Sequence, residues 1–250
     1  MDNNTLTVGD TKPLRRDLWR LEPLTVFFVL GSSIVYTVWA ALQNAHYYAA
    51  PYLSPFYSPC ISANCEHVSV PLIGLGWNFS PAFLILWIPG GFRITCYYHC
   101  KGYYWPFAGL PAGGAASGTF KSYQGETRLP AILQRTHQYF FWLSIPVLAF
   151  LWGYAIFAFR FPDGLGAGIG TLVLLINATF LSLYAFSCRR LRVAPHGFYN
   201  SQPRQGFWNS VSRLNERHVL FAWVSLIWVV LSDLYIRLVS MGIISDLRFF

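Results

Sequence analysis

Residues 218–238 read HVLFAWVSLIWVVLSDLYIRL, and this stretch decides the fold. Its only charged residues are Asp233 and Arg237, near its C-terminal end. About 20 mostly apolar residues are enough for a helix to cross the hydrocarbon core of a bilayer. Because lipid offers no partner to backbone polar groups, such a segment must be helical. The stretch therefore predicts a transmembrane helix.

Four more stretches have the same character, at about 23–43, 79–98, 137–159 and 168–188. Across the chain 54% of residues are hydrophobic and 11% are charged. Soluble domains carry about 25% charged residues, so this composition disfavours a soluble enzyme.

We therefore predict an all-α integral membrane protein with a bundle of five transmembrane helices over residues 23–240. Residues 1–22 form a cytoplasmic N-terminal segment, and they lack the apolar core of a cleaved signal peptide. Residues 241–250 form an extracytoplasmic tail. Pro89-Gly90-Gly91 and Pro146 predict kinks, and the glycine-rich run 164–170 favours a tight turn.

The basic residues predict the orientation. Most of the 18 Lys and Arg residues fall on the side of the N-terminus, whereas the loop at 45–78 has none. The positive-inside rule makes the N-terminal side cytoplasmic, in a bacterial inner membrane. Topology thus accounts for the net charge of +8, and no nucleic-acid partner is expected.

Two cysteines and two histidines fall at one predicted depth. Cys96 ends the second helix, His137 opens the third, Cys188 closes the fourth and His218 opens the fifth. Thiols and imidazoles that meet inside a bundle form a metal-ligand set. The set suits zinc or an iron–sulfur cluster, and it is also that of a Rieske-type [2Fe–2S] centre. The alternative is that the thiols fill the core and the imidazoles lie among headgroups.

A soluble-Rieske pattern, Cys-x-His followed by Cys-x-x-His, also occurs in the chain. It pairs Cys65 and His67 with Cys96 and His99. The predicted topology puts the two pairs on opposite sides of a core about 30 Å thick, so they cannot share a cluster. His99 and Cys100 lie one turn beyond Cys96, at the wetter end, and their role stays open.

Other polar residues have narrower interpretations. Cys60 and Cys65 share the outer loop, where an oxidising compartment favours a disulfide over two free thiols. Asp233 and Arg237 have the spacing of an i, i+4 ion pair, with a proton path as the alternative. Arg93, one turn before Cys96, either steadies charge on a cluster or quinone or extends to the interface.

Several stretches carry a resemblance to a known family. They are SPFYSPC at 54–60, FRITCYY at 92–98, GETRLP at 125–130, residues 134–141, Ser187-Cys188, and residues 212–215 leading to His218. Together they resemble the membrane-anchor subunit of the heme-free (type F, mycobacterial-like) succinate dehydrogenases, which are respiratory complex II enzymes. The similar region spans about Arg15 to Val239.

The resemblance implies a five-helix anchor that docks a flavoprotein and an iron–sulfur subunit on its cytoplasmic face. Those partners carry FAD and further iron–sulfur clusters. It implies a Rieske-type [2Fe–2S] cluster on Cys96, His137, Cys188 and His218. Electrons from succinate would reach a quinone, either menaquinone or ubiquinone, through that cluster.

The chain itself has no predicted catalytic residue. Arg93, Tyr97 and Tyr139 are candidates for a quinone pocket from their depth alone. The direction of the reaction and a homo-oligomer of the complex stay open.

Two other functions compete with this one. In a heme b cytochrome anchor, His137 and His218 would be axial ligands, which leaves both cysteines idle. In a structural anchor the site would hold zinc or nothing. A small transporter is disfavoured because the sequence lacks inverted repeats.

Overall fold

A computed structural model describes residues 21–58, 70–71, 78–79, 82–96, 98–99, 128–188 and 210–249. Within these ranges the long helices are α1 (Leu21–Gln43), α2 (Phe83–Ile94), α4 (Arg128–Phe157), α5 (Ile169–Phe186) and α7 (His218–Ser240). A short helix over residues 210–216 precedes α7. The predicted all-α membrane bundle is confirmed.

Short hairpins lie between α1 and α2 and between α4 and α5. The paired strands are β1 (Tyr48–Ala49) with β2 (Tyr52–Leu53), β3 (Val70–Pro71) with β4 (Asn78–Phe79), and β5 (Arg160–Phe161) with β6 (Gly164–Leu165), all antiparallel. The 3-10 turn η2 (Pro55–Tyr57) follows β2. Gly164 has a φ of +134°, which only glycine adopts easily, and it is the first residue of β6. The tight turn lies at Pro162 and Asp163, just before the run 164–170 where it was predicted, and the run itself forms β6 and leads into α5.

Four of the described helices are long and apolar enough to cross a membrane. These segments are Leu24–Gln43, Arg135–Phe157, Ile169–Phe186 and His218–Ser240. The other, α2, has 12 residues, which is about 18 Å of helix and less than the core thickness. The predicted start of this helix at Phe79 is wrong, because Phe79 pairs with Val70 in a hairpin and α2 begins at Phe83.

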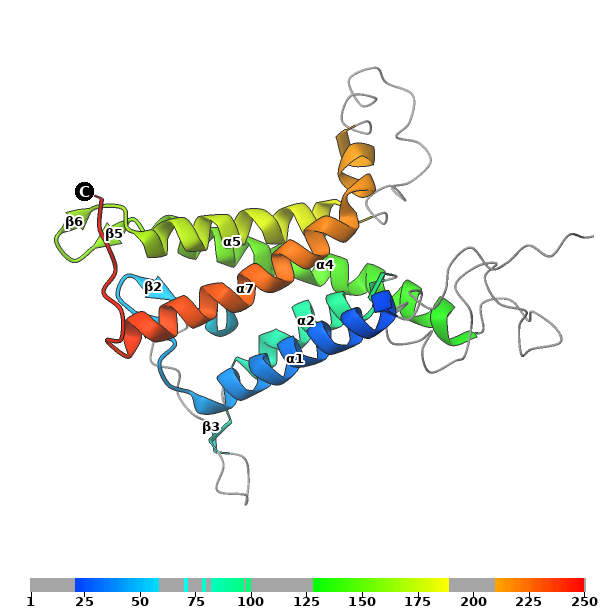
Figure 1. The fold of residues 1–250 in the computed structure, drawn as a ribbon, viewed down its shortest axis with the longest axis horizontal. Helices are drawn as coiled ribbons and strands as arrows, with labels where there is room; N and C mark the ends of the chain where they lie inside the picture. The colour runs from blue at the N-terminus through cyan, green and yellow to red at the C-terminus, as the bar shows by residue number, and fades with distance from the viewer. Residues whose placement is uncertain are drawn as a thin grey trace, which may run out of the picture.

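The outer surface of the bundle is apolar, as lipid requires. Val35 is 70% exposed, Trp142 65% and Ile156 62%. Contiguous exposed apolar surface on this scale marks contact with a membrane rather than water. Inside, α7 packs on α5, α5 on α4, and α4 on α2, with α1 against α7. In the view of Figure 1, α1 and α2 are both drawn below α7.

One end of the bundle is fastened by the segment after α7. Asp246 accepts hydrogen bonds from the hydroxyls of Tyr52 and Tyr235, both at 2.5 Å, and from the backbone N–H of Gly170 at 3.0 Å. Burial and the bond to Asp246 raise the pKa of Tyr52 to about 12. Tyr52 is therefore neutral near pH 7, and it can donate to the carboxylate.

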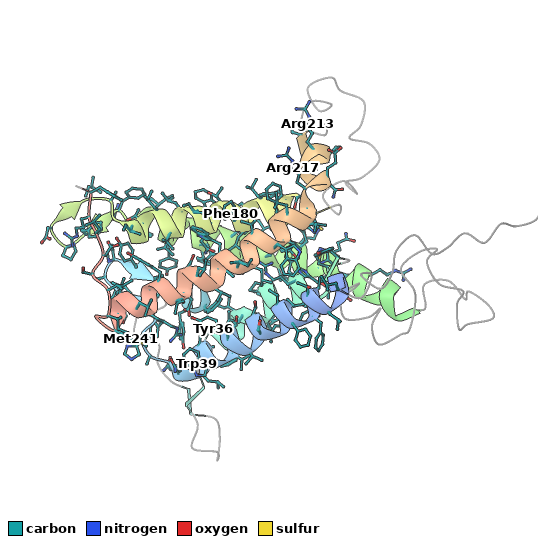
Figure 2. All side chains as sticks on the ribbon, in the orientation of Figure 1. Tyr36, Trp39, Phe180, Arg213, Arg217 and Met241 are labelled. Carbon is teal, nitrogen blue, oxygen red and sulfur yellow. The ribbon has the colours of Figure 1, made fainter. Side chains whose placement is uncertain are left out.

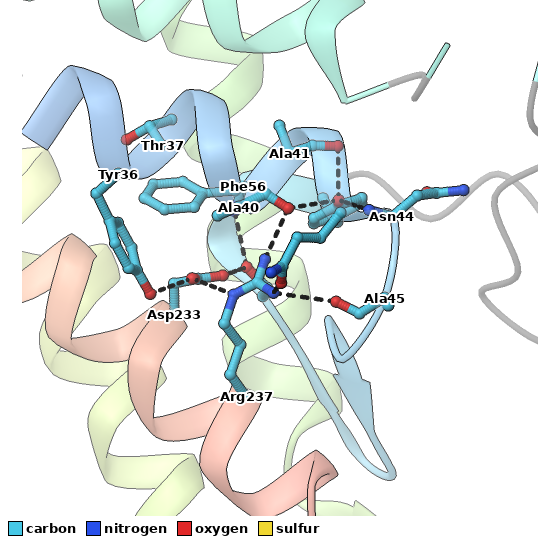
Figure 3. Close-up of polar contacts among 12 residues, drawn as sticks. Tyr36, Thr37, Ala40, Ala41, Asn44, Ala45, Phe56, Asp233 and Arg237 are labelled. Carbon is cyan, nitrogen blue, oxygen red and sulfur yellow. Dashed lines mark hydrogen bonds and ion pairs between the residues drawn. The ribbon is translucent and has the colours of Figure 1, made fainter. Parts of the chain in front are cut away.

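A buried ion pair lies between α7, α1 and the loop that follows α1 (Figure 3). Arg237 Nε is 2.7 Å from an oxygen of Asp233, so the predicted i, i+4 pair is confirmed. Both side chains are at most 2% exposed. Asp233 also accepts bonds from Tyr36 and Ser54. The remaining donors of Arg237 bind Gln43 Oε1 and the carbonyls of Ala40 and Ala45.

Because the hydrogen-bond partners of this carboxylate and guanidinium lie on α1 and in the residues after it, the network holds these segments against α7. The sequence predicted the pair but not its burial, since its partners come from residues almost 200 positions away.

Candidate metal centre

The four predicted ligands come from four helices at the end of the bundle away from the β5–β6 hairpin. Cys96 lies directly after the last turn of α2, and Cys188 directly after the last turn of α5. His218 is the first residue of α7. His137 lies in α4, near the start of its apolar part at Arg135. Cys96, His137 and Cys188 are at most 5% exposed.

The structure brings these side chains together as two cysteine–histidine pairs. Sγ of Cys96 is 3.3 Å from Nε2 of His218. Sγ of Cys188 is 3.0 Å from Nε2 of His137. Each pair joins two different helices. Among the described residues no three His, Cys, Asp or Glu side chains converge on one point that could hold a metal ion.

Hydroxyl groups hold the far side of both imidazoles. Thr95 Oγ1 is 3.1 Å from Nδ1 of His137, and Ser187 Oγ is 2.8 Å from Nδ1 of His218. Thr95 directly precedes Cys96, and Ser187 directly precedes Cys188. The end of α2 therefore touches both histidines, and so does the end of α5. Because both helix ends contact both histidines, the Cys96–His218 pair and the Cys188–His137 pair lie side by side.

Aromatic rings surround the pairs. Phe92 stacks on the His137 ring at 4.5 Å, and Tyr184 stacks on the His218 ring at 5.2 Å. Phe92 and Tyr184 also contact each other, with their centroids 5.2 Å apart. Both are at most 3% exposed, so the pairs lie in a dry, apolar setting.

Arg93 places a positive charge beside the pairs. Its guanidinium donates to the carbonyl of Ala222 and to Ser225 Oγ, both at 3.0 Å. It also lies 4.6 Å from the centre of the Tyr184 ring. These hydrogen-bond partners are neutral, so they do not neutralise the buried charge of Arg93.

Two buried polar groups nearby have no nitrogen or oxygen partner among the described residues. They are the His99 ring and the hydroxyl of Tyr184, which has the Cys96 thiol as its neighbour. His99 is 1% exposed, so the expectation that it lies at a wet end is wrong: its ring packs against Tyr98 and Tyr184. Buried polar atoms are almost always satisfied in native proteins. The His99 ring and the Tyr184 hydroxyl could therefore donate hydrogen bonds to a bound cofactor that carries acceptor atoms, such as the sulfides of an iron–sulfur cluster.

The predicted quinone residues are not all in one place. Arg93 lines an apolar cavity of about 290 Å³ between α1, α2 and α7, whose other lining residues are uncharged. Tyr139 is 72% exposed and does not line that cavity. Tyr97 lies outside the described residues, as do Cys100, Cys60 and Cys65, so the disulfide stays a prediction.

The sequence reasoning missed Thr95, Ser187 and Tyr184. A signal for the first two was present: a hydroxyl residue directly precedes a cysteine at the ends of two helices. Tyr184 has no such signal, because only the packing of α5 on α7 brings it to His218.

Comparison with known proteins gives two matches. Residues 21–242 match the family model described as actinobacterial succinate dehydrogenase subunit SdhC. A chain of the structure described as the Mycobacterium smegmatis Sdh1 complex in the apo form aligns with a TM-score of 0.79 and 38% identity. The alignment covers 95% of this chain and 94% of that chain. No curated protein sequence matches.

Proposed function

Because the chain belongs to the family of actinobacterial succinate dehydrogenase subunit SdhC, we propose that it relays electrons from succinate to quinone within the membrane. As a member of that family it is a membrane-anchor, non-flavin subunit of a succinate dehydrogenase complex. The relay requires a redox group inside the bundle, and the paired Cys and His side chains are the candidates for holding it.

In this proposal Cys96, His137, Cys188 and His218 hold a Rieske-type [2Fe–2S] cluster, which takes up and releases one electron. The observation that carries the proposal is the pair of cysteine–histidine contacts at 3.3 and 3.0 Å. A binuclear cluster needs two protein ligands for each iron, so four ligands grouped around an elongated centre suit it. A single ion needs three or four that converge, and the described residues offer no such group.

The chain's own residues have separate tasks around that centre. The thiolates and imidazoles bind, Phe92 and Tyr184 exclude water, and Arg93 offsets the negative charge that an added electron brings. The buried positive charge of Arg93 favours the reduced form of a bound centre and so raises its reduction potential.

The heme b alternative fits this geometry poorly. An axial ligand needs its Nε2 to face an open slab for the macrocycle. Here Nε2 of His137 ends on Cys188 and Nε2 of His218 ends on Cys96. A heme would also leave both thiols without a role.

Quinone binding is proposed beside the centre, in the apolar cavity that Arg93 lines. An arginine in the lining of an otherwise uncharged cavity is suited to a polar ring carbonyl, while the apolar wall takes a hydrocarbon tail. Tyr139 is not part of this site, because its side chain is exposed on the outer face of α4.

The partners are proposed to dock at the end that holds the centre. Arg213 and Arg217 lie beyond the start of α7 at that end, whereas Met241 marks the other end (Figure 2). The positive-inside rule makes the end with Arg213 and Arg217 cytoplasmic. There it would meet a flavoprotein with FAD and an iron–sulfur subunit, in a bacterial inner membrane.

The direct test uses the purified complex with His137→Ala or His218→Ala. Each variant should lose the Rieske-like EPR signal and the reduction of quinone. Succinate-dependent reduction of an artificial acceptor by the flavoprotein should persist. Gln138→Ala is the matched control, since Gln138 is exposed beside His137. If the signal and quinone reduction survive both histidine changes, the ligand assignment is wrong.

A further inference from the structure

We propose that Thr95 and Ser187 are positioning residues that hold His137 and His218 as their Nδ1–H tautomers, so that Nε2 is the metal-binding atom of each. This inference rests on the proposed function for the identity of the bound centre. The tautomers themselves follow from hydrogen bonds within the chain.

The dipeptides Thr95-Cys96 and Ser187-Cys188 have equivalent positions in the fold. Each follows the last turn of a helix, with nearly the same backbone: φ −82° and ψ −7° at Thr95, φ −75° and ψ −7° at Ser187. In each, the cysteine N–H bonds a carbonyl three residues earlier at 3.2 Å. The equivalent geometry presents a hydroxyl and a thiol from each helix end.

The hydroxyl of Thr95 decides the proton on His137. Thr95 Oγ1 lies 2.6 Å from the carbonyl oxygen of Gly91 and 3.1 Å from Nδ1 of His137. A carbonyl has no hydrogen, and two bare oxygens at 2.6 Å would repel. The one hydroxyl hydrogen must therefore point at Gly91. Thr95 can then only accept at its other contact, so Nδ1 of His137 carries the hydrogen.

The same reasoning applies to Ser187. Its Oγ lies 2.9 Å from the carbonyl oxygen of Tyr184 and 2.8 Å from Nδ1 of His218. Its hydrogen is used on the Tyr184 carbonyl, so Nδ1 of His218 is the donor. Asn215 adds support, because its Nδ2 donates to the carbonyl of Ser187 at 2.8 Å and fixes the turn next to His218.

A neutral imidazole with its hydrogen on Nδ1 has a lone pair on Nε2. Both Nε2 atoms face a cysteine sulfur, at 3.0 and 3.3 Å. In the unloaded chain each thiol can donate its hydrogen to Nε2. When the thiols are deprotonated, the lone pairs and the thiolates can all bind iron.

The contacts cross between the two dipeptides. Thr95 holds the histidine that faces Cys188, and Ser187 holds the histidine that faces Cys96. Each helix end thus supplies a ligand and also orients the histidine that faces the other ligand. Partners that fix a metal-bound histidine in this way also raise its basicity, and losing one typically lowers metal affinity about 10- to 100-fold.

The first test reads the tautomer without any mutation. The complex is made with histidine carrying ¹⁵N at Nδ1 only or at Nε2 only, and electron–nuclear double resonance is recorded on the reduced centre. The expected result is strong coupling to the Nε2 label and weak coupling to the Nδ1 label. Strong coupling to the Nδ1 label would overturn the inference.

The second test removes the hydroxyls. Thr95→Val and Ser187→Ala should each lower iron retention by the purified complex about 10- to 100-fold on challenge with a chelator. Thr95→Ser and Ser187→Thr keep the acceptor and should retain iron as the wild type does. Retention unchanged in the valine and alanine variants would contradict a positioning role.

Two control variants remove a hydroxyl that makes the same helix bond but touches no histidine. Thr179 bonds the carbonyl of Leu175, and Ser144 bonds that of Phe141. Thr179→Val and Ser144→Ala should leave iron retention unchanged, and a loss there equal to that of Thr95→Val would refute the specific role. A wild-type complex without any Rieske-like signal would instead refute the proposed function, so the two failures are distinguishable.

Discussion

Nε2 of His137 lies 3.0 Å from Sγ of Cys188, although the two residues belong to different helices and are 51 positions apart in the chain. At this distance inside an apolar bundle, the nitrogen and the sulfur either share a hydrogen bond or are ligands of one metal centre. A second contact of the same kind joins Cys96 and His218, and the proposed metal centre would use both contacts.

The thiols should therefore be as necessary as the imidazoles. Cys96→Ala and Cys188→Ala are each expected to remove the iron of the membrane centre, because the alanine side chain has no atom that can bind iron. Iron and acid-labile sulfide analysis of the purified complex measures this. Ala185→Ser, one turn before Cys188, is a control for disturbance of the helix end. A full complement of iron in either cysteine variant would exclude that cysteine as a ligand.

Hydropathy was sufficient to predict the helical segments. A run of about 20 apolar residues that crosses lipid must form a helix, because only its own backbone can satisfy its N–H and C=O groups. It failed at the start of α2, where Phe79 is apolar but lies in a strand. A composition window does not distinguish an apolar strand residue from the first turn of the helix that follows it.

The sequence predicted the membrane depth of the four candidate ligands, but it did not predict which of them contact each other. Topology placed Cys96, His137, Cys188 and His218 at one level, but the rotation of each helix about its axis decides which side chains meet. That rotation follows from packing, for example of Phe92 on His137. The partners of Asp233 come from α1 and the loop after it, so sequence spacing revealed only Arg237.

The buried ion pair should be costly to break on one side only. Asp233→Ala leaves the guanidinium of Arg237 buried without its carboxylate, and we expect a loss of about 3–5 kcal/mol. Thermal unfolding of the purified complex should show a lower midpoint. The double change Asp233→Leu with Arg237→Met should be less harmful than Asp233→Ala, because no uncompensated charge remains. Equal midpoints for Asp233→Ala and the wild type would show that the pair does not stabilise the fold.

Two neighbouring glycines in α2 allow a controlled test of how α2 packs on α4. A Cβ at Gly91 would overlap the Phe140 ring, whereas one at Gly90 meets nothing within 4 Å. Gly91→Ala should cost about 1–3 kcal/mol through overpacking. Gly90→Ala should be neutral or should stabilise α2 by up to about 1 kcal/mol. Thermal unfolding distinguishes them, and equal effects of the two changes would contradict the packing of α2 on α4.

The tail after α7 should depend on Asp246. Asp246→Ala removes the acceptor of Tyr52, Tyr235 and the Gly170 N–H, so we expect a loss of about 1–3 kcal/mol and faster proteolysis of the C-terminal residues. Asp163→Ala is the comparison, because Asp163 is 82% exposed in its ion pair with Arg248 and such surface pairs contribute little. Equal proteolysis of the two variants would show that Asp246 does not hold the tail.

The presence of an iron–sulfur centre in this chain is measured by EPR spectroscopy of the reduced complex, with iron and sulfide counted on the same sample. We expect a Rieske-like signal from one centre in this chain, with two irons and two sulfides beyond those of the partner subunits. A heme spectrum in its place, or no iron beyond that of the partners, would contradict it.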